Sequence, residues 1–301
     1  MQVEPALVIL RWLQFAAAAV ALGLPLFEAY AVRGGSSSLA RRTGIAAGGL
    51  LACAAAAGLV AQTALMAGGW TAALSLPALG YVLQSTGPGL AHGVRTTLAL
   101  AGGALLLLGR GDPRARRLAV VAFAGATASF AWSGHGASSE GPAGVIHLLA
   151  DIVHAVAAAV WLGALVGFCL RLAREGPDSV ATAGALTQFA GVGTAAVVAL
   201  ALSGLVNAAF LIGPDGASRL PGSVWGGLLL AKLALFAVML GLAAHNRYSL
   251  TPALAAAVAA GGETAPAMRK LRVSIGLELT TGVVLLGLVA VMGIQMPPVA
   301  L

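Results

Sequence analysis

Long apolar runs, separated by short polar segments, dominate the pattern of residues along this chain. Eight runs approach or exceed the length of about 20 residues that a membrane-spanning helix needs. They lie at 6–31, 43–66, 91–109, 117–134, 143–170, 182–212, 224–245 and 271–295. The runs are continuous rather than alternating, which favours helices over the strands of a membrane barrel. The pattern therefore predicts an all-α, polytopic membrane helical bundle of about eight transmembrane helices.

The segments between these runs predict one domain. The run at 70–84 is shorter and contains Pro77, so we expect a helix that lies along the membrane interface or re-enters it. The segment 248–268 is rich in Ala, Gly and Pro and is expected to be the longest loop. No soluble domain, long linker or repeat is recognisable, which predicts a single transmembrane domain over residues 1–301.

The charged residues orient the predicted bundle. Only 9% of the residues are charged, against about 25% in soluble domains. The net charge of +7 does not indicate a nucleic-acid partner, because cytoplasmic loops of membrane proteins accumulate Lys and Arg. Thirteen basic residues fall in alternate loops: Arg33, Arg41, Arg42, Arg110, Arg114, Arg116, Arg117, Arg171, Arg174, Arg247, Arg269, Lys270 and Arg272. The opposite loops hold only Arg219, which predicts that both termini are periplasmic.

Three titratable residues lie within one predicted span. His147, Asp151 and His154 fall within about 60° of arc on a helix, so they form one stripe. Ionisable side chains inside a membrane usually face the bundle interior and mark a functional site. The alternative is a set of interhelical hydrogen bonds that only fix the packing.

The predicted orientation brings further candidate ligands to the same leaflet. His92 begins the third run and His135 follows the fourth, so we expect both near the stripe. Imidazole and carboxylate bind Cu, Zn, Fe or Ni, and thioethers such as those of Met66 and Met296 suit Cu(I). His147 and His154 are about 10 Å apart along the axis. Either one of them pairs with another helix or the stripe holds successive metal stations.

Other charges within the spans are candidates for ion pairs or for the transport path. Arg11 and Lys232 lie in the same half as the stripe, where either could pair with Asp151. Glu278 lies within about two turns of the cytoplasmic side, where it could pair with Arg272 or Arg247. Cys53 and Cys169 lie inside apolar runs without a nearby partner, so we expect both to be free thiols.

Several motifs together resemble the copper resistance D (CopD) family of bacterial inner-membrane proteins. They are Arg11 with Gly23 and Pro25; Ser133-Gly134-His135; the His147, Asp151, His154 stripe followed by Trp161-Leu162-Gly163; Ser203-Gly204; Lys232 with Asn246-Arg247; and Arg272-Ser274-Glu278. The resemblance covers nearly the whole chain. Two positions depart from the family pattern: Gln14 stands where a histidine is frequent, and His92 is not an expected family histidine.

The resemblance implies a multi-pass protein of the bacterial inner membrane, embedded in the lipid bilayer, that imports periplasmic copper and is not an enzyme. It also implies a periplasmic, CopC-like copper-binding partner. A different hypothesis is a membrane redox protein that uses the same histidines to hold haem b. Because the histidines gather in one leaflet, a two-haem arrangement is disfavoured but a single haem is not. A third hypothesis is a proton-coupled transporter of another solute that uses the Asp, His, Lys and Glu groups.

Overall fold

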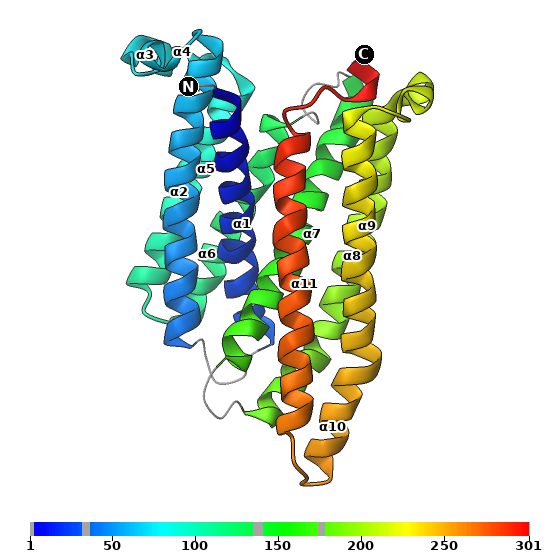
Figure 1. Ribbon diagram of the computed structural model, residues 1–301. Coiled ribbons are helices and arrows are strands. Elements are labelled where there is room, and N and C mark those ends of the chain that lie inside the picture. Colours follow the sequence, from blue (N-terminus) through cyan, green and yellow to red (C-terminus); the bar gives the residue numbers. More distant parts are fainter. Residues whose placement is uncertain (1–2, 32–36, 135–140, 174–177, 301) are drawn as a thin grey trace.

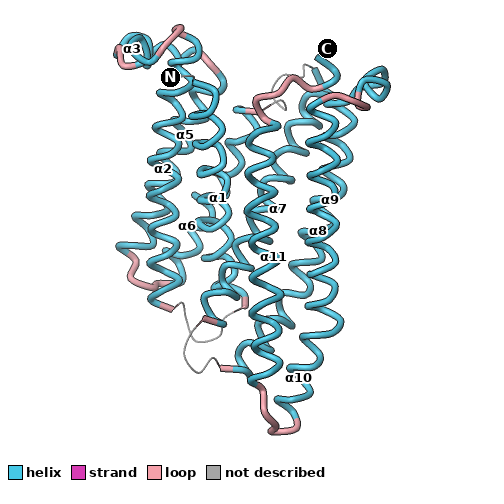
Figure 2. Tube along the Cα trace, viewed as in Figure 1, coloured by secondary structure: helices cyan, strands magenta, loops and turns pink. Residues whose placement is uncertain are grey.

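The protein is a bundle of long helices (Figures 1 and 2). The computed structural model describes residues 3–31, 37–134, 141–173 and 178–300, and these contain helices, turns and no strand. The long helices are α1 (Val3–Tyr30), α2 (Ser38–Met66), α5 (Gly87–Leu108), α7 (Gly141–Leu172), α8 (Ser179–Gly216), α9 (Val224–His245) and α11 (Ala265–Met292). Seven helical stretches of the described chain are long and apolar enough to cross a membrane. The predicted all-α, polytopic membrane bundle is thereby confirmed.

The fourth predicted span, 117–134, has a different form from the others. Here α6 (Pro113–Ala128) has 16 residues, which is about 24 Å and shorter than a bilayer core of about 30 Å. A 3₁₀ segment, η1 (Ser129–Ser133), continues it by five residues, or about 10 Å. Together they have the length of one crossing. Both termini lie at the same end of the bundle, as expected for an even number of crossings (Figure 1).

Two shorter segments, 70–84 and 248–268, were expected to be a short helix and a loop, and only the first expectation agrees with the structure. The run 70–84 forms two short helices, α3 (Trp70–Ala73) and α4 (Leu76–Ser85), at the end that holds the termini (Figure 1). The prediction of a loop over 248–268 is wrong. A π-helical turn, η4 (Asn246–Leu250), leads directly into α10 (Thr251–Ala259). Alanine has the highest helix propensity, so this Ala-rich segment stays helical until Gly261, whose φ of 61° ends it.

The crossing of α1 and α7 is a close backbone contact between the two halves of the chain. Gly23 on α1 faces Gly163 on α7, the glycine of the Trp-Leu-Gly motif. A Cβ atom added at Gly163 would lie 2.5 Å from the carbonyl oxygen of Ala19 and 2.6 Å from the carbonyl carbon of Gly23. Only glycine permits this approach of two backbones, as at other small-residue crossings in membranes. The crossing holds in place the helix that carries the titratable stripe.

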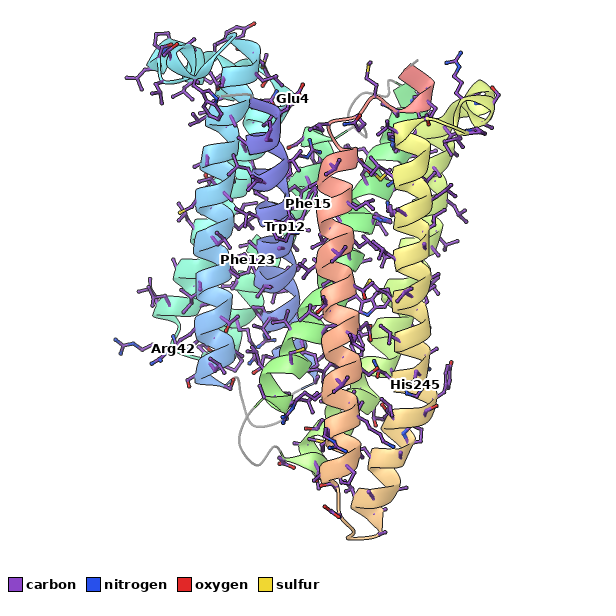
Figure 3. The ribbon with its side chains drawn as sticks, viewed as in Figure 1. Glu4, Trp12, Phe15, Arg42, Phe123 and His245 are labelled. Atoms are coloured by element: carbon purple, nitrogen blue, oxygen red, sulfur yellow. The ribbon has the colours of Figure 1, made fainter. Side chains whose placement is uncertain are left out.

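The orientation predicted from the loop charges has a direct test. Glu4 and Arg42 lie at opposite ends of the bundle (Figure 3), whereas Arg33 and Arg174 lie outside the described residues. A reporter that is active only in the cytoplasm, fused after Leu301, is expected to stay silent, because the basic loops hold the other end inside. The same reporter inserted between Gly261 and Gly262 should be active. A strong signal from the fusion after Leu301 would contradict the orientation.

Candidate functional site

A polar cavity of about 390 Å³ lies in the half of the bundle nearer the termini. Its walls come from α1, α2, α5, α6, η1, α7, α8, α9 and α11, so both halves of the chain contribute. The polar side chains that line it are Arg11, Gln14, Gln62, His92, Arg95, Thr127, Ser133, Asp151, His154, Asn207 and Lys232. The cavity therefore gathers most of the titratable groups that the sequence placed in this part of the bundle.

Arg95 organises the wall formed by the first half of the chain. Its side chain is only 1% exposed, and its guanidinium lies 3.9 Å from the centre of the Phe130 ring. It donates hydrogen bonds to Gln14 Oε1 at 2.6 Å, Ser129 Oγ at 3.1 Å and Ser133 Oγ at 2.9 Å. Gln14, which replaces the frequent family histidine, also donates from Nε2 to the Ala54 carbonyl at 3.1 Å. This wall holds a buried positive charge with three neutral acceptors.

His92 belongs to the Arg95 wall. Its Nδ1 lies 3.4 Å from Nη1 of Arg95, and because arginine can only donate, Nδ1 is the acceptor. The ring packs against Gly58, where a Cβ would lie 2.5 Å from Cε1. To bind copper through Nδ1, His92 would have to release Arg95 and hold a cation beside a guanidinium. Its surroundings therefore favour metal binding less than those of His154.

Asp151 and His154 form the opposite wall. Asn207 donates from Nδ2 to Oδ1 of Asp151 at 2.6 Å, which ties α7 to α8. The carboxylate also attracts the ammonium group of Lys232 on α9. Lys232 therefore lies close enough to Asp151 for their charges to attract, which is one of the two pairings that the sequence left open.

Hydrogen bonding assigns the tautomer of His154. Its Nδ1 lies 3.0 Å from Ser203 Oγ. The serine hydroxyl donates its own proton to the Ala199 carbonyl at 2.6 Å, so the hydroxyl oxygen accepts from His154 Nδ1. In the neutral ring Nε2 then carries the lone pair. A histidine whose tautomer is fixed through one nitrogen is the usual arrangement of a metal ligand.

Arg11 lines the same cavity as Asp151. Its guanidinium lies against Gly293 at the end of α11, where an added Cβ would be 2.7 Å from Nη2. The charge of Arg11 acts on His92 and Arg95, across the cavity wall from Asp151. Its Nε atom is buried and finds no hydrogen-bond partner among the residues that the structure describes.

The other candidate ligands are more scattered. His147 is 2% exposed and stacks on Phe210 with ring centres 4.6 Å apart, and it is not among the residues that line the cavity. His135 lies outside the described residues. Met66 and Met296 are 52% and 66% exposed and do not line the cavity. Among the described residues, no three His, Cys, Asp or Glu side chains converge as a metal centre would require.

Glu278 forms a separate buried site nearer the other end of the bundle. The prediction that it pairs with Arg272 or Arg247 is wrong. Its Oε1 accepts from Trp161 Nε1, and its Oε2 accepts from Asn246 Nδ2, both at 2.8 Å. Arg247 instead turns to α8, where it donates to the Ala190 carbonyl at 3.0 Å. Because Asn246 starts the π-helical turn, the carboxylate joins α7, α11 and this irregular segment.

Glu278→Gln is expected to destabilise the protein by about 1–3 kcal/mol, because a buried donor loses its acceptor. The glutamine amide offers one oxygen, so Trp161 and Asn246 cannot both donate to it. The measurement is thermal unfolding of the detergent-purified protein. Trp161→Phe in the Glu278→Gln background should cost less than the two single changes added together. Strict additivity would show that the hydrogen bond contributes nothing.

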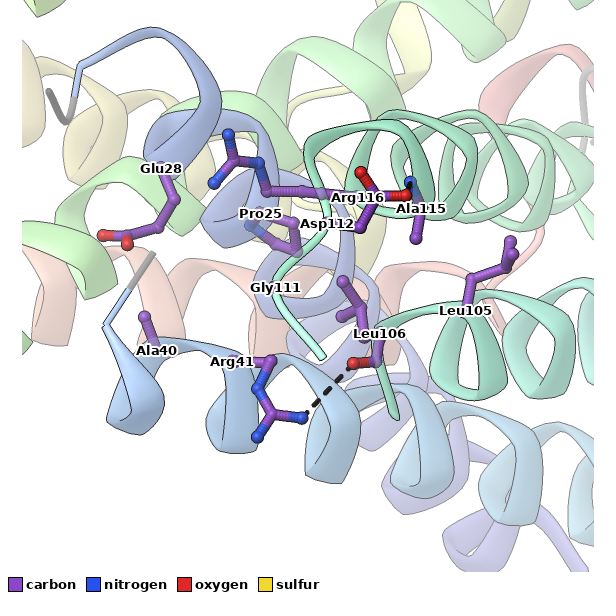
Figure 4. Close-up of a pocket in the computed structure, with 10 residues that line it drawn as sticks. All are labelled: Pro25, Glu28, Ala40, Arg41, Leu105, Leu106, Gly111, Asp112, Ala115 and Arg116. Atoms are coloured by element: carbon purple, nitrogen blue, oxygen red, sulfur yellow. Dashed lines mark hydrogen bonds between the residues drawn. The ribbon is translucent and has the colours of Figure 1, made fainter. Parts of the chain in front are cut away.

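A second, much smaller cavity lies near the opposite end of α1. It measures about 20 Å³, which is close to the space that one water needs. Glu28, Arg41 and Arg116 come to it from α1, α2 and α6, and Arg41 donates to the Leu106 carbonyl at 3.4 Å (Figure 4). Its small size and the presence of charges of both signs suit a structural contact between helices rather than a ligand site.

Sequence patterns did not predict how the side chains that support the cavity pair with one another. Gln14, Arg95 and Ser129 come from three helices, and Asn207 and Ser203 belong to a helix distant in sequence from Asp151 and His154. The one available signal was an arginine in the middle of an apolar run, which must find buried acceptors. Which acceptors it finds depends on the packing of the helices.

Comparisons with known proteins place this bundle among copper resistance proteins. A family model described as "Copper resistance protein D-like, N-terminal domain" matches residues 1–145, and one described as "Copper resistance protein D" matches residues 183–292. A "Copper resistance protein D" from Pseudomonas syringae pv. tomato is 34% identical over 98% of this chain and 97% of its own length. The "Inner membrane protein YebZ" of Escherichia coli K12 is 32% identical over 66% of this chain and 67% of its own. No solved structure matches.

Proposed function

The chain belongs to the copper resistance protein D family, and from that premise we propose that it imports copper from the periplasm through its polar cavity. It is a multi-pass protein of the inner membrane with a copper-related function. The proposal adds a direction, a path and named ligands. A periplasmic copper-binding protein of the CopC kind would deliver the ion, and no chemical reaction would be catalysed.

The position of His154 carries the proposal. Its Nε2 lone pair belongs to a ring fixed by Ser203, and the ring lines a cavity that also contains the Asp151 carboxylate. Imidazole nitrogen and carboxylate oxygen both bind copper, and one turn of α7 separates the two residues. In this role Asp151 gives up its attraction to Lys232 and instead contacts either the metal or His154. Lys232 would then return the carboxylate to its resting place after the ion leaves.

Asp151→Asn is expected to weaken copper binding about 10–100-fold, the usual cost of losing a carboxylate partner of a metal site. The amide keeps the size of the side chain and its contact with Asn207, so the fold should be retained. Copper titration of the detergent-purified protein measures the affinity. Asp112→Asn is a matched control, because Asp112 caps α6 outside the cavity and asparagine caps equally well. Unchanged affinity in Asp151→Asn would contradict the assigned site.

The haem alternative rests on one observation. His92 on α5 and His154 on α7 line the same cavity, so two histidines from different helices face one space. An optical spectrum of the purified protein distinguishes the alternatives. A copper importer is expected to lack the intense Soret band of haem and to retain copper by elemental analysis. A stoichiometric Soret band that His154→Ala abolishes would replace copper import with haem binding.

A further inference from the structure

The fixed charges around the cavity do not match a bare metal ion. Among the described residues that line it, Arg11, Arg95 and Lys232 are basic and Asp151 is the single carboxylate. Lys232 and Asp151 attract each other and offset their charges. The two guanidinium groups leave an excess of positive charge, and arginine does not lose its proton in proteins. In a low-dielectric bundle this excess repels a free copper cation.

The two arginines are held very differently. Arg95 is surrounded by Gln14, Ser129, Ser133 and the face of Phe130, so its charge is solvated by the protein. Arg11 has no such acceptors in the described part of the chain, and its buried Nε lacks a partner. Arg11 is partly exposed and only its Nε is enclosed, so its charge faces the cavity without a protein acceptor, and an anion placed in the cavity would pair with it. Gly293 provides the space that lets Arg11 adopt this position.

The size of the cavity also exceeds what a metal ion needs. Its volume of about 390 Å³ falls within the range of about 300–1,000 Å³ typical of pockets for small organic molecules. Apolar side chains from α1, α7 and α11, among them Phe15, Leu162 and Leu286, complete the lining. A mixture of apolar walls and a few fixed polar groups is typical of sites that hold an organic ligand.

We propose that the cavity binds a small carboxylate anion that accompanies copper as its ligand, and that Arg11 is the main group that holds the anion. This inference rests on the proposed copper import and specifies the form in which the ion enters. The carboxylates neutralise both the metal and the guanidinium excess, and arginine binds a carboxylate through two parallel hydrogen bonds. His154 and Asp151 remain available to the metal on the opposite wall.

Binding of radiolabelled citrate, without copper, to the purified protein tests the anion site. The wild-type protein is expected to bind citrate saturably, and Arg11→Gln is expected to weaken this binding at least about tenfold. Arg11→Lys should retain part of it, because lysine keeps the charge but loses the paired geometry. Arg269→Gln, in the predicted cytoplasmic loop, is the matched control and should bind citrate like the wild type.

The outcomes separate this inference from the function on which it rests. If citrate does not bind saturably, or binds equally well to Arg11→Gln, the anion site is wrong, whereas copper binding that depends on Asp151 would leave the import proposal intact. If citrate binding depends on Arg11 but copper affinity is the same in Asp151→Asn as in the wild type, the import proposal fails and the anion site stands. Displacement of citrate by phosphatidylglycerol micelles, but not by free glycerol phosphate, would assign Arg11 to a lipid headgroup and overturn a soluble ligand.

Discussion

His154→Ala is expected to reduce copper transfer to the level of cells that lack the protein. The substitution removes the Nε2 lone pair that we assign to the metal, and it leaves Ser203 with its own bond to the Ala199 carbonyl. Loss of a partner that only orients a ligand costs about 10–100-fold in affinity, so loss of the ligand itself should cost at least as much as the upper value. The measurement is copper accumulated per cell at both low and abundant external copper.

His147→Ala is the informative comparison, because His147 lies on the same helix but stacks on Phe210 instead of lining the cavity. The two-station hypothesis from the sequence expects it to reduce accumulation at low copper, where capture is limiting, whereas the position of His147 outside the cavity predicts transfer at abundant copper near the wild-type level. The double variant should be as defective as His154→Ala. If both single variants lose binding to the same degree and the double is no worse, one shared site holds both histidines and the two-station hypothesis is wrong.

Gly163→Leu is expected to prevent stable folding, the second large effect. The new side chain would have to occupy the space of the Ala19 carbonyl oxygen and the Gly23 backbone, which cannot move without separating α1 from α7. Overpacking that a core can absorb costs about 1–3 kcal/mol, and a backbone contact leaves less room for adjustment. Thermal unfolding and the monodisperse yield after detergent extraction measure the effect.

Gly276→Leu on α11 provides the matched control for the glycine contact. It introduces the same side chain into the same bundle, and an added Cβ there meets nothing within 4 Å. We expect its yield and melting temperature to stay close to the wild-type values. A stable Gly163→Leu protein would show that the two helices separate without penalty.

The fold was predictable wherever the length of an apolar run determines whether the chain forms a membrane-spanning helix. Runs such as 43–66 and 143–170 became α2 and α7, because a bilayer requires each apolar run to satisfy its backbone internally. The error over 248–268 had a local cause. Small residues were taken as signs of a loop, whereas six alanines between 253 and 260, with Leu254 buried, make a good helix.

The site was predictable in its chemistry but not in its pairings. The helical period placed Asp151 and His154 on one face, and the structure puts both on the cavity wall. The same period also included His147, whose stacking on Phe210 depends on how α8 packs against α7. Glu278 was assigned to the nearest arginines, yet its carboxylate accepts hydrogen bonds from Trp161 and Asn246 instead. Hydrogen bonds between helices depend on the angles at which the helices pack, and local sequence patterns do not predict those angles.

Copper flux into sealed vesicles tests the central claim most directly, because it requires no partner protein or cell. Purified protein is reconstituted into liposomes that contain a copper-sensitive fluorescent chelator, and copper is added outside together with citrate. The wild-type protein and Asp112→Asn are expected to fill the vesicles well above the leak of protein-free liposomes, and His154→Ala should not exceed that leak. Wild-type vesicles that fill no faster than empty ones, or His154→Ala vesicles that fill as fast as the wild type, would contradict copper import through this cavity.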